Sequence, residues 1–219
     1  MKPAVRRARG ASRLNAVDRL TRDAGILGIT LTEPDARRLL LQLDELAHWN
    51  RSFNLTAITE RAAMVTHHLL DSLSIHADLR GHTVADVGTG AGFPGLPLAV
   101  CNPQKRFTLI DSSAKKVRFV AHAAERMGLT NVEAIHTRGE GYAPPAPFDT
   151  VVARALAPLP RLVEFVAPLC GPATQVLAMK GRRPDEEIAA LPAGWKVEGV
   201  RELAVPGLDA QRCLVVLRR

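Results

Sequence analysis

Two carboxylates and a group of glycines have the types and spacing of a nucleotide-binding site. Residues 84–100 read VADVGTGAGFPGLPLAV, in which a short glycine-rich segment interrupts an apolar run. Glycine lets a tight turn bring its backbone close to a ligand, so this segment is typical of the loop between a first strand and its helix. The pattern G-x-G-x-x-G is matched from Gly90, whereas Phe93 breaks it when the count begins at Gly88. The pattern alone does not choose a ligand.

Two acidic residues narrow the class of ligand. Asp86 precedes the first glycine of the loop by two positions, and Asp111 ends the next predicted strand. A carboxylate at the end of that strand can accept both hydrogen bonds of a ribose diol, in NAD or in S-adenosylmethionine. An acid beside the loop suits the cationic amino end of a methionyl group and would repel a pyrophosphate. We therefore expect Asp86, Gly88, Gly90 and Asp111 to bind S-adenosylmethionine. The alternatives are a carboxylate that caps the loop amides at position 86 and a helix N-cap at position 111.

Length and composition indicate one ordinary domain with a basic balance of charge. The chain has 219 residues, of which 47% are hydrophobic, and its formal net charge of +7 favours a polyanionic partner such as nucleic acid. Five of the positive charges lie in residues 1–13, and we expect a disordered basic arm there. No apolar run is long enough to predict a membrane span. Cys101, Cys170 and Cys213 lack metal-ligand spacing and predict buried thiols in a cytoplasmic protein, which we expect to be a monomer.

The predicted elements form a helical segment followed by an alternating unit. Apolar residues at helical spacing predict helices over 14–27, 33–48 and 60–79. Strands are predicted at 83–87, 106–110, 131–136, 148–154, 174–180, 195–203 and 212–218, with helices at 94–101, 113–128 and 159–169. This alternation is typical of a parallel sheet, although the short link between the last two strands predicts an antiparallel one there. We expect an extension over 14–80 that forms one compact unit with a Rossmann-like domain over 81–219.

Several longer motifs resemble those of one enzyme family. They are HWNRSFNLTAI (48–58), HHLLDSL (67–73), GTGAGFPGLPLA (88–99), TLIDSSAKKVRFV (108–120), NVEAIHTRGE (131–140), FDTVVARALAPL (148–159) and AMKG (178–181). Over residues 35–185 the chain closely resembles the bacterial 16S ribosomal RNA guanine-N7 methyltransferases, the RsmG or GidB family. The resemblance implies a class I S-adenosylmethionine-dependent methyltransferase, with a Rossmann-like, mostly parallel seven-stranded sheet and a helical N-terminal extension.

The resemblance also implies site residues. The cofactor contacts of the family fall on Gly88, Phe93, Gly139, Glu140 and Arg154. Guanine N7 has a lone pair and no proton, so the reaction requires alignment rather than a general base. Arg154 and Lys180, at the ends of the fourth and fifth predicted strands, are the candidates for direct assistance. A structural salt bridge is the alternative for Arg154, and a solvated surface lysine is the alternative for Lys180.

Basic residues near the predicted site are candidates for contact with RNA. They are Lys115, Lys116, Arg118, Arg138 and Lys180, and a merely soluble helix face is the alternative for the first three. His67 and His68 lack further ligands at metal spacing, so we expect no metal site and predict a hydrogen-bonded His68–Asp71 pair. Two other functions stay open: an NAD(P)-dependent oxidoreductase on the same fold and a non-catalytic RNA-binding ribosome-assembly factor.

Overall fold

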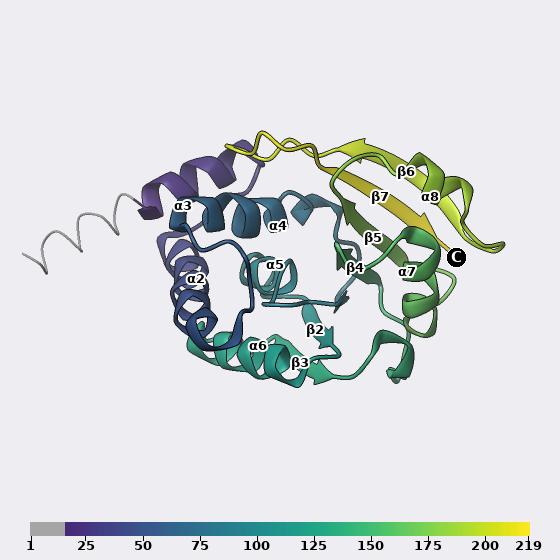
Figure 1. The fold of residues 1–219 in the computed structure, drawn as a ribbon, viewed down its shortest axis with the longest axis horizontal. Coiled ribbons are helices and arrows are strands. Elements are labelled where there is room, and N and C mark those ends of the chain that lie inside the picture. Colours follow the sequence, from purple (N-terminus) through teal and green to yellow (C-terminus); the bar gives the residue numbers. More distant parts are fainter. Residues whose placement is uncertain (1–15) are drawn as a thin grey trace, which may run out of the picture.

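Helices form the first part of the structure, a computed structural model that describes residues 16–219 (Figure 1). Residues 16–26 and α2 (Glu33–Phe53) are separate helices, and Thr32 caps α2 by accepting a hydrogen bond from the backbone N–H of Asp35 at 3.3 Å. The third predicted helix is divided. It consists of α3 (Arg61–Met64), the π-helical turn η1 (Val65–Leu70) and α4 (Asp71–Leu73), and the 3₁₀ turn η2 (His76–Asp78) follows it. The predicted basic arm at 1–13 lies outside the described residues.

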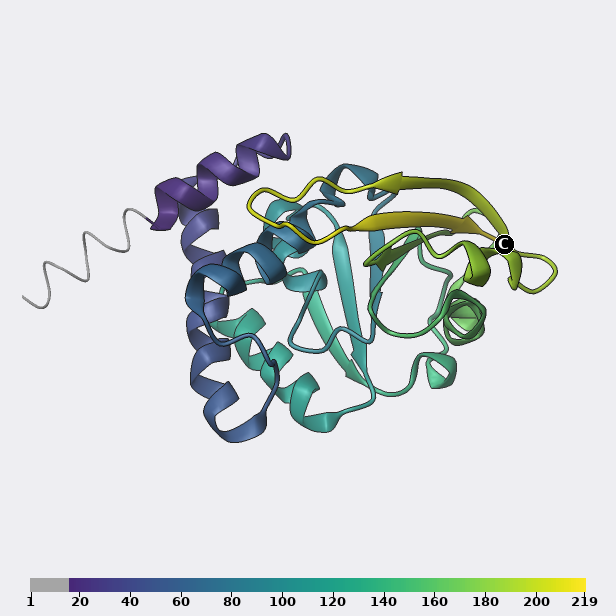
Figure 2. The same ribbon diagram turned by 45° about the horizontal axis from the view of Figure 1, so that its top comes forward.

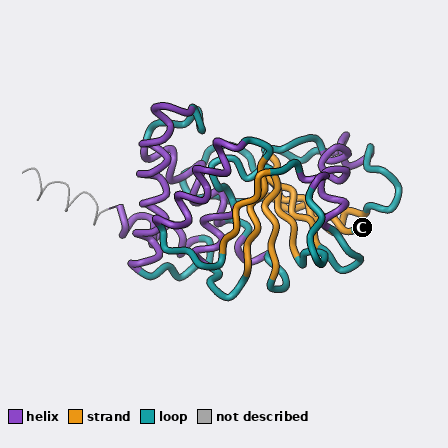
Figure 3. The backbone as a smooth tube through the Cα atoms, turned by 90° about the horizontal axis from the view of Figure 1, so that it is seen from below, coloured by secondary structure: helices purple, strands orange, loops and turns teal. Residues whose placement is uncertain are grey.

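A seven-stranded sheet follows, as predicted (Figure 3). Its strands are β1 (Thr83–Val87), β2 (Arg106–Asp111), β3 (Val132–His136), β4 (Thr150–Arg154), β5 (Gln175–Lys180), β6 (Lys196–Glu202) and β7 (Cys213–Arg218). Their order across the sheet is β3-β2-β1-β4-β5-β7-β6. The pairs from β3 to β5 are parallel, and β7 is antiparallel to both of its neighbours, which confirms the antiparallel strand expected in the tail.

Helices cover both faces of the sheet and bury two hydrophobic clusters. The connecting helices are α5 (Gly95–Cys101), α6 (Ala114–Arg126), η3 (Gly139–Gly141), α7 (Leu159–Val166), η4 (Ala167–Leu169) and α8 (Asp185–Ala189), the last of which the sequence did not predict. One cluster joins the helical extension, α5 and α6 to one face, and the other joins α7 and η4 to the opposite face. Within residues 16–219, no helix combines the length and apolarity needed to cross a membrane.

One edge of the sheet brings together the strand ends that can carry a ligand site. Because β5 and β6 are both antiparallel to β7, β6 runs in the same direction as β1–β5. Lys180 at the end of β5 and Glu202 at the end of β6 both pair in register with Cys213 at the start of β7. Ligands of open α/β sheets bind outside the carboxyl ends of the strands. The residues just before β7 therefore share this edge with the loops that follow β1, β2, β4 and β5.

Helix α5 lies unusually close to the sheet at its first residue. Gly95 donates its backbone N–H to the buried Asp86 carboxylate at 2.8 Å. An ideal Cβ at position 95 would lie 2.7 Å from Asp86 Oδ2 and 2.8 Å from Leu109 Cγ. The last glycine of the G-x-G-x-x-G match is thus required because the helix and the sheet touch there, which is the packing role expected of that position.

Gly95→Ala is expected to destabilise the fold because its new methyl group would overlap two buried side chains. Overpacking of this kind costs about 1–3 kcal/mol, and urea titration should show a loss of that size in the free energy of unfolding. Gly25→Ala is the matched control, since Gly25 is helical and a Cβ there would have nothing within 4 Å. Alanine is the better helix former, so the control should be neutral or stabilised by up to about 1 kcal/mol. Equal losses in both variants would contradict the close packing.

Candidate active site

The glycine loop between β1 and α5 is folded against the end of β2. The backbone N–H groups of Gly88 and Thr89 both donate to the Ile110 carbonyl, at 2.8 and 3.1 Å. Gly88 has a φ of +72° and Gly90 a φ of +61°, the left-handed region that favours glycine. A Cβ at Gly88 would also lie 2.5 Å from Leu156 Cδ1, whereas a Cβ at Gly90 would meet nothing closer than 4.0 Å. Gly88 is therefore required by its conformation, and the end of the flexible Leu156 side chain packs against it.

Asp86 lies behind this loop. Its fully buried carboxylate accepts hydrogen bonds from Thr89 Oγ1 at 2.6 Å and from the backbone N–H of Gly95 at 2.8 Å, both at Oδ2. The other oxygen is buried without a hydrogen-bond partner among the described residues. Burial raises the pKa of Asp86 to about 6. Asp86 thus has the alternative role of capping the loop, and its contact with the cofactor, directly or through water, stays a prediction.

A first pocket, of about 460 Å³, opens at the carboxyl ends of β1, β2 and β4. Five residues predicted to bind the cofactor line it: Gly88, Asp111, Gly139, Glu140 and Arg154. The apolar part of its wall comes from Val87, Ile110, Leu156 and Phe165. A Cβ at Gly139 would lie 3.0 Å from both the Phe165 carbonyl oxygen and Val87 Cγ1, so the backbone closely approaches this wall. The volume and the mixture of apolar wall with a few polar groups are those of a small-molecule site.

Asp111 accepts two backbone hydrogen bonds beside the first pocket, and it is not the N-cap of α6, since Ser113 occupies that position. Its Oδ1 accepts a hydrogen bond from the backbone N–H of Ser113, and its Oδ2 accepts one from that of Gly90, each at 2.9 Å. The first bond orders the start of α6, and the second ties the glycine loop to β2. A carboxylate has about four acceptor sites, so this pocket-lining group retains capacity for ribose hydroxyls.

A second pocket, of about 450 Å³, adjoins the first and shares Gly88, Arg154 and Ala155 with it. Gly90 and Phe93 lie in its wall. The helical extension contributes Leu55, Thr56, Ile58, His67, His68 and Asp71, and the opposite side comes from Met179, Lys180, Gly181 and Arg212. Ala155 has a φ of +51°, a strained conformation for a residue other than glycine. Such residues cluster at functional sites, and this one lies at the junction of the two pockets.

The extension supports the glycine loop through its helices and the segment that follows α2. Buried Gln42 of α2 donates from Nε2 to the Ala91 carbonyl at 3.3 Å. The ring of His68 stacks on Phe93 with 4.7 Å between centroids, and Thr56 Oγ1 lies 3.0 Å from His68 Nε2. Burial, reinforced by the nearby Arg154, lowers the pKa of His68 to about 4, so the ring is neutral at pH 7. The predicted His68–Asp71 hydrogen bond is wrong: Thr56, not Asp71, is the partner of His68.

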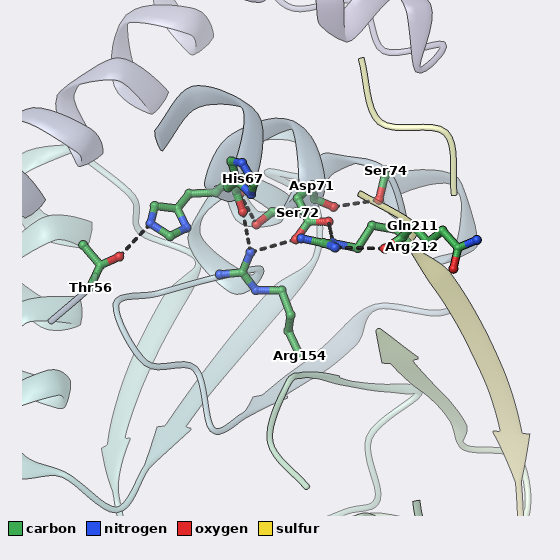
Figure 4. A network of polar contacts seen from close by, with 9 residues as sticks. Thr56, His67, Asp71, Ser72, Ser74, Arg154, Gln211 and Arg212 are labelled. Carbon is green, nitrogen blue, oxygen red and sulfur yellow. Dashed lines mark hydrogen bonds and ion pairs between the residues drawn. The ribbon is translucent and has the colours of Figure 1, made fainter. Parts of the chain in front are cut away.

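Asp71 instead joins two arginines at the centre of the site (Figure 4). Arg154 Nη1 lies 2.9 Å from Asp71 Oδ2 and also donates to the His67 carbonyl at 2.9 Å. Arg212 Nε lies 2.9 Å from Asp71 Oδ1. The Arg154 guanidinium also lies 5.4 Å from the centroid of the Phe93 ring. The structural salt bridge considered for Arg154 is present, and the same guanidinium lines both pockets.

Lys180 has internal partners that the sequence did not predict. Its ammonium donates to Glu187 Oε2 at 2.7 Å and to the Ala157 carbonyl at 2.8 Å, and its side chain is only 14% exposed. Glu187 belongs to α8, the helix missing from the predicted elements. The solvated lysine is therefore excluded, since these partners hold the ammonium inside the protein, whereas a contact of the third ammonium donor with an RNA phosphate stays a prediction. Lys180 lines the second pocket as a buttress between β5 and α8.

The other predicted RNA contacts surround the first pocket or lie on α6. Lys116 lines that pocket, with its Nζ 3.7 Å from Asp111 Oδ2, and Arg138 lines it as well. Lys115 is exposed and donates to the Phe53 carbonyl at 3.1 Å, and Arg118 is exposed farther along the helix.

The sequence analysis did not predict that Arg212 belongs to the site. The signal was the antiparallel last strand, which places the residue before it at the ligand-binding edge.

Asp86→Asn is expected to change how stability depends on pH. Since the pKa of Asp86 is raised to about 6 from 3.8, the folded chain keeps this proton at pH values where the unfolded chain has lost it. The contribution of Asp86 to the free energy of unfolding is therefore full below about pH 4 and is lost as the pH rises through 6. For a shift of two pKa units this loss is about 3 kcal/mol. The asparagine variant lacks this loss. Urea titrations should show its stability relative to the native chain improving by up to that amount from pH 4 to pH 7.

Asp149→Asn provides a control of opposite sign. Hydrogen bonds from the backbone N–H groups of His82 and Thr83 lower the pKa of Asp149, so its contribution to stability is lost as the pH falls. The difference between this variant and the native chain should therefore shrink toward low pH. A pH-independent difference for Asp86→Asn would contradict the buried, loop-capping carboxylate.

Comparison with known proteins identifies the family. Residues 35–215 match the family model GidB, described as rRNA small subunit methyltransferase G. Ribosomal RNA small subunit methyltransferase G of Pseudomonas aeruginosa (strain LESB58) is 46% identical over 204 residues, covering 92% of this chain and 95% of that protein. The protein of the same name from Nitrosococcus oceani is 46% identical over 196 residues, covering 88% and 90%. A SAM-dependent methyltransferase structure from Aquifex aeolicus has a TM-score of 0.53 at 20% identity, covering 72% of this chain and 93% of that one, and so confirms the class I fold. The chain belongs to the rRNA small subunit methyltransferase G family.

Proposed function

We propose that this protein transfers a methyl group from S-adenosylmethionine to N7 of a guanine in 16S ribosomal RNA. The observation that carries the proposal is the pair of adjoining pockets at the ligand-binding edge, which share Gly88, Arg154 and Ala155. A methyl donor in the first pocket and a base in the second would meet at these three residues. Membership of a methyltransferase family favours this reaction over that of an NAD(P)-dependent oxidoreductase.

The first pocket has the chemistry that S-adenosylmethionine needs. Asp111 would accept hydrogen bonds from the ribose hydroxyls, and the wall formed by Leu156 and Phe165 would contact the adenine ring. Gly88 and Gly139 leave room where a side chain would collide with the wall of the pocket. Asp111 and Glu140 also place negative charge in a site for a cationic ligand. When bound, S-adenosylmethionine would supply an electrophilic methyl group. The guanine N7 lone pair would form the new bond to the methyl carbon without loss of a proton, while the bond from carbon to sulfur breaks and S-adenosylhomocysteine leaves.

Arg154 is the residue best placed to align the two ligands. Both N–H groups of its Nη1 are used by Asp71 and the His67 carbonyl, which leaves the donors on Nη2 and Nε for a ligand. Its side chain is 19% exposed and lines both pockets. We infer that these donors bind the cofactor or guanine O6, so that N7 stays free. Asp71, which also pairs with Arg212, offsets part of the positive charge that Arg154 would otherwise place beside a sulfonium.

The chain needs no general base for this reaction, so its residues have to position the ligands and exclude water. Proximity and orientation of this kind contribute about 7–11 kcal/mol to lowering a barrier. The stacked Phe93 and His68 rings and the fixed Arg154 guanidinium form a rigid wall suited to that task. Together with the shared hydrophobic cluster, these contacts also support the extension and the sheet acting as one unit. We further propose that the protein acts as a monomer in the cytoplasm, where its substrate would be assembled.

The proposal is tested by incubating the purified protein with methyl-labelled S-adenosylmethionine and small ribosomal subunits from cells that lack it. We expect label in a single guanine of 16S RNA, with N7 identified by chain cleavage after borohydride and aniline treatment. RNA binding without label transfer would contradict the proposal and favour the non-catalytic assembly factor. Saturable fluorescence transfer to bound NADH would contradict it in favour of the oxidoreductase.

Arg154→Ala is expected to lower turnover more than stability. The variant loses the donors that face both pockets, so the rate at saturating substrates should fall by about a hundredfold, as misplacement of reactants does. Asp71 keeps Arg212 as a partner, which limits the loss of folding free energy to about 1–3 kcal/mol. Arg38→Ala, which removes an exposed arginine paired with Asp35 on α2, should change neither quantity measurably. An unchanged methylation rate in Arg154→Ala would remove Arg154 from the site.

A further inference from the structure

The surface beside the second pocket is lined by arginines. A hollow of about 100 Å³ lies next to that pocket and shares Arg212 with it. Arg182 and Arg183 follow β5, and Arg201 lies near the end of β6. We call these four residues the C-terminal arginine surface. Arg182, Arg183 and Arg201 are exposed to solvent, whereas Arg212 is partly buried.

The topology of the sheet explains why residues so far apart in sequence meet here. The carboxyl ends of β5 and β6 and the amino end of β7 lie side by side, because Lys180 and Glu202 both pair with Cys213. In Figures 1 and 2, β6 and β7 form the outer part of the sheet. The loop from β6 to β7 runs back toward residues 16–26, and its residues 203–208 line a pocket with Arg22 and Ile26. The arginine surface thus extends the ligand-binding edge beyond the second pocket.

Most of these arginines have carboxylate partners, and the exposed pairs are weak ones. Arg183 pairs with Asp185 at 2.6 Å, with both side chains more than 60% exposed, at 61% and 69%. Arg201 pairs with Asp78, and Glu202 is a further acid in the hollow. Arg182 has no acidic partner within residues 16–219. Exposed pairs contribute little and are screened by salt, so phosphate can replace them, whereas the buried pair with Asp71 fixes Arg212.

We propose that the C-terminal arginine surface binds backbone phosphates of the RNA strand beside the target guanine. This inference rests on the proposed RNA substrate. Guanidinium groups bind phosphate through paired, charge-assisted hydrogen bonds, and such contacts set the register of a strand without reading its sequence. A strand whose base occupies the second pocket would reach Arg182 and Arg183 next, because Arg212 lines both that pocket and the hollow. The start of α6 is less suited, because Lys116 lines the first pocket, where the cofactor is proposed to bind, and neither Lys115 nor Lys116 lines the second pocket or the hollow.

The test compares native protein with the double variant Arg182→Gln/Arg183→Gln in methyl transfer to small ribosomal subunits at several salt concentrations. Both residues are exposed in a loop, so the variant should fold normally. Each lost phosphate contact reduces the slope of log affinity against log salt by about 0.7–0.9. We expect kcat/KM for the subunit to fall by about tenfold at low salt and the slope to decrease by 1–2 units. The kcat at saturating RNA and the affinity for S-adenosylmethionine should not change.

Lys196→Gln/Arg219→Gln is the matched control, since it removes two exposed charges from the other ends of β6 and β7. It should keep the native slope. The inference is overturned if Arg182→Gln/Arg183→Gln keeps the native slope, or if only Lys115→Gln/Arg118→Gln on α6 reduces it. Failure of the proposed function is a separate result, because the native protein itself would then transfer no methyl group to the RNA.

Discussion

A single buried carboxylate, Asp71, joins the three parts of the chain that meet at the site. Its arginine partners lie 83 and 141 residues away in sequence, at the end of β4 and just before β7. Removing such charges from water is costly, and a well-packed apolar group is often as stabilising as a buried ion pair. We therefore interpret the two ion pairs of Asp71 as positioning the arginine side chains rather than as stabilising the fold. They fix the direction of the Arg154 guanidinium, and with it the junction between the two pockets.

The helical extension is as much a part of the site as the sheet is. A Rossmann-like sheet alone supplies the first pocket, whose lining comes from residues 87–165. The second pocket needs Leu55, Thr56 and the π-helical turn that carries His67 and His68. A π turn in a helix is frequent at functional sites, and here it places the His67 carbonyl against Arg154. The helical extension thus supplies one wall of the second pocket, in which the guanine is proposed to bind.

Local patterns in the sequence predicted the sheet, the glycine loop and most of the first pocket, because a strand, a glycine turn and a helix start are short-range signals. The partners of charged side chains could not be predicted in the same way. Lys180 pairs with Glu187 on a short helix that has no apolar periodicity in the sequence. Asp86 hydrogen-bonds to its own glycine loop and to the start of α5, which packs so closely that solvent does not reach the carboxylate. The predicted antiparallel direction of the last strand could have placed Arg212 at this edge, but its pairing with Asp71, 141 residues away in sequence, could not be predicted.

The central claim is that Asp71 acts on methyl transfer by positioning Arg154. A double-mutant cycle tests it most directly, with Asp71→Asn, Arg154→Gln and the combined variant compared by single-turnover transfer at saturating RNA and S-adenosylmethionine. Saturating RNA suppresses any contribution of Arg212 to binding. If Asp71 acts through Arg154, the transfer rate of the combined variant should lie within about threefold of the rate of Arg154→Gln alone. The coupling energy between the two substitutions should then exceed about 1 kcal/mol. Independent, multiplying losses from the two substitutions would contradict the account.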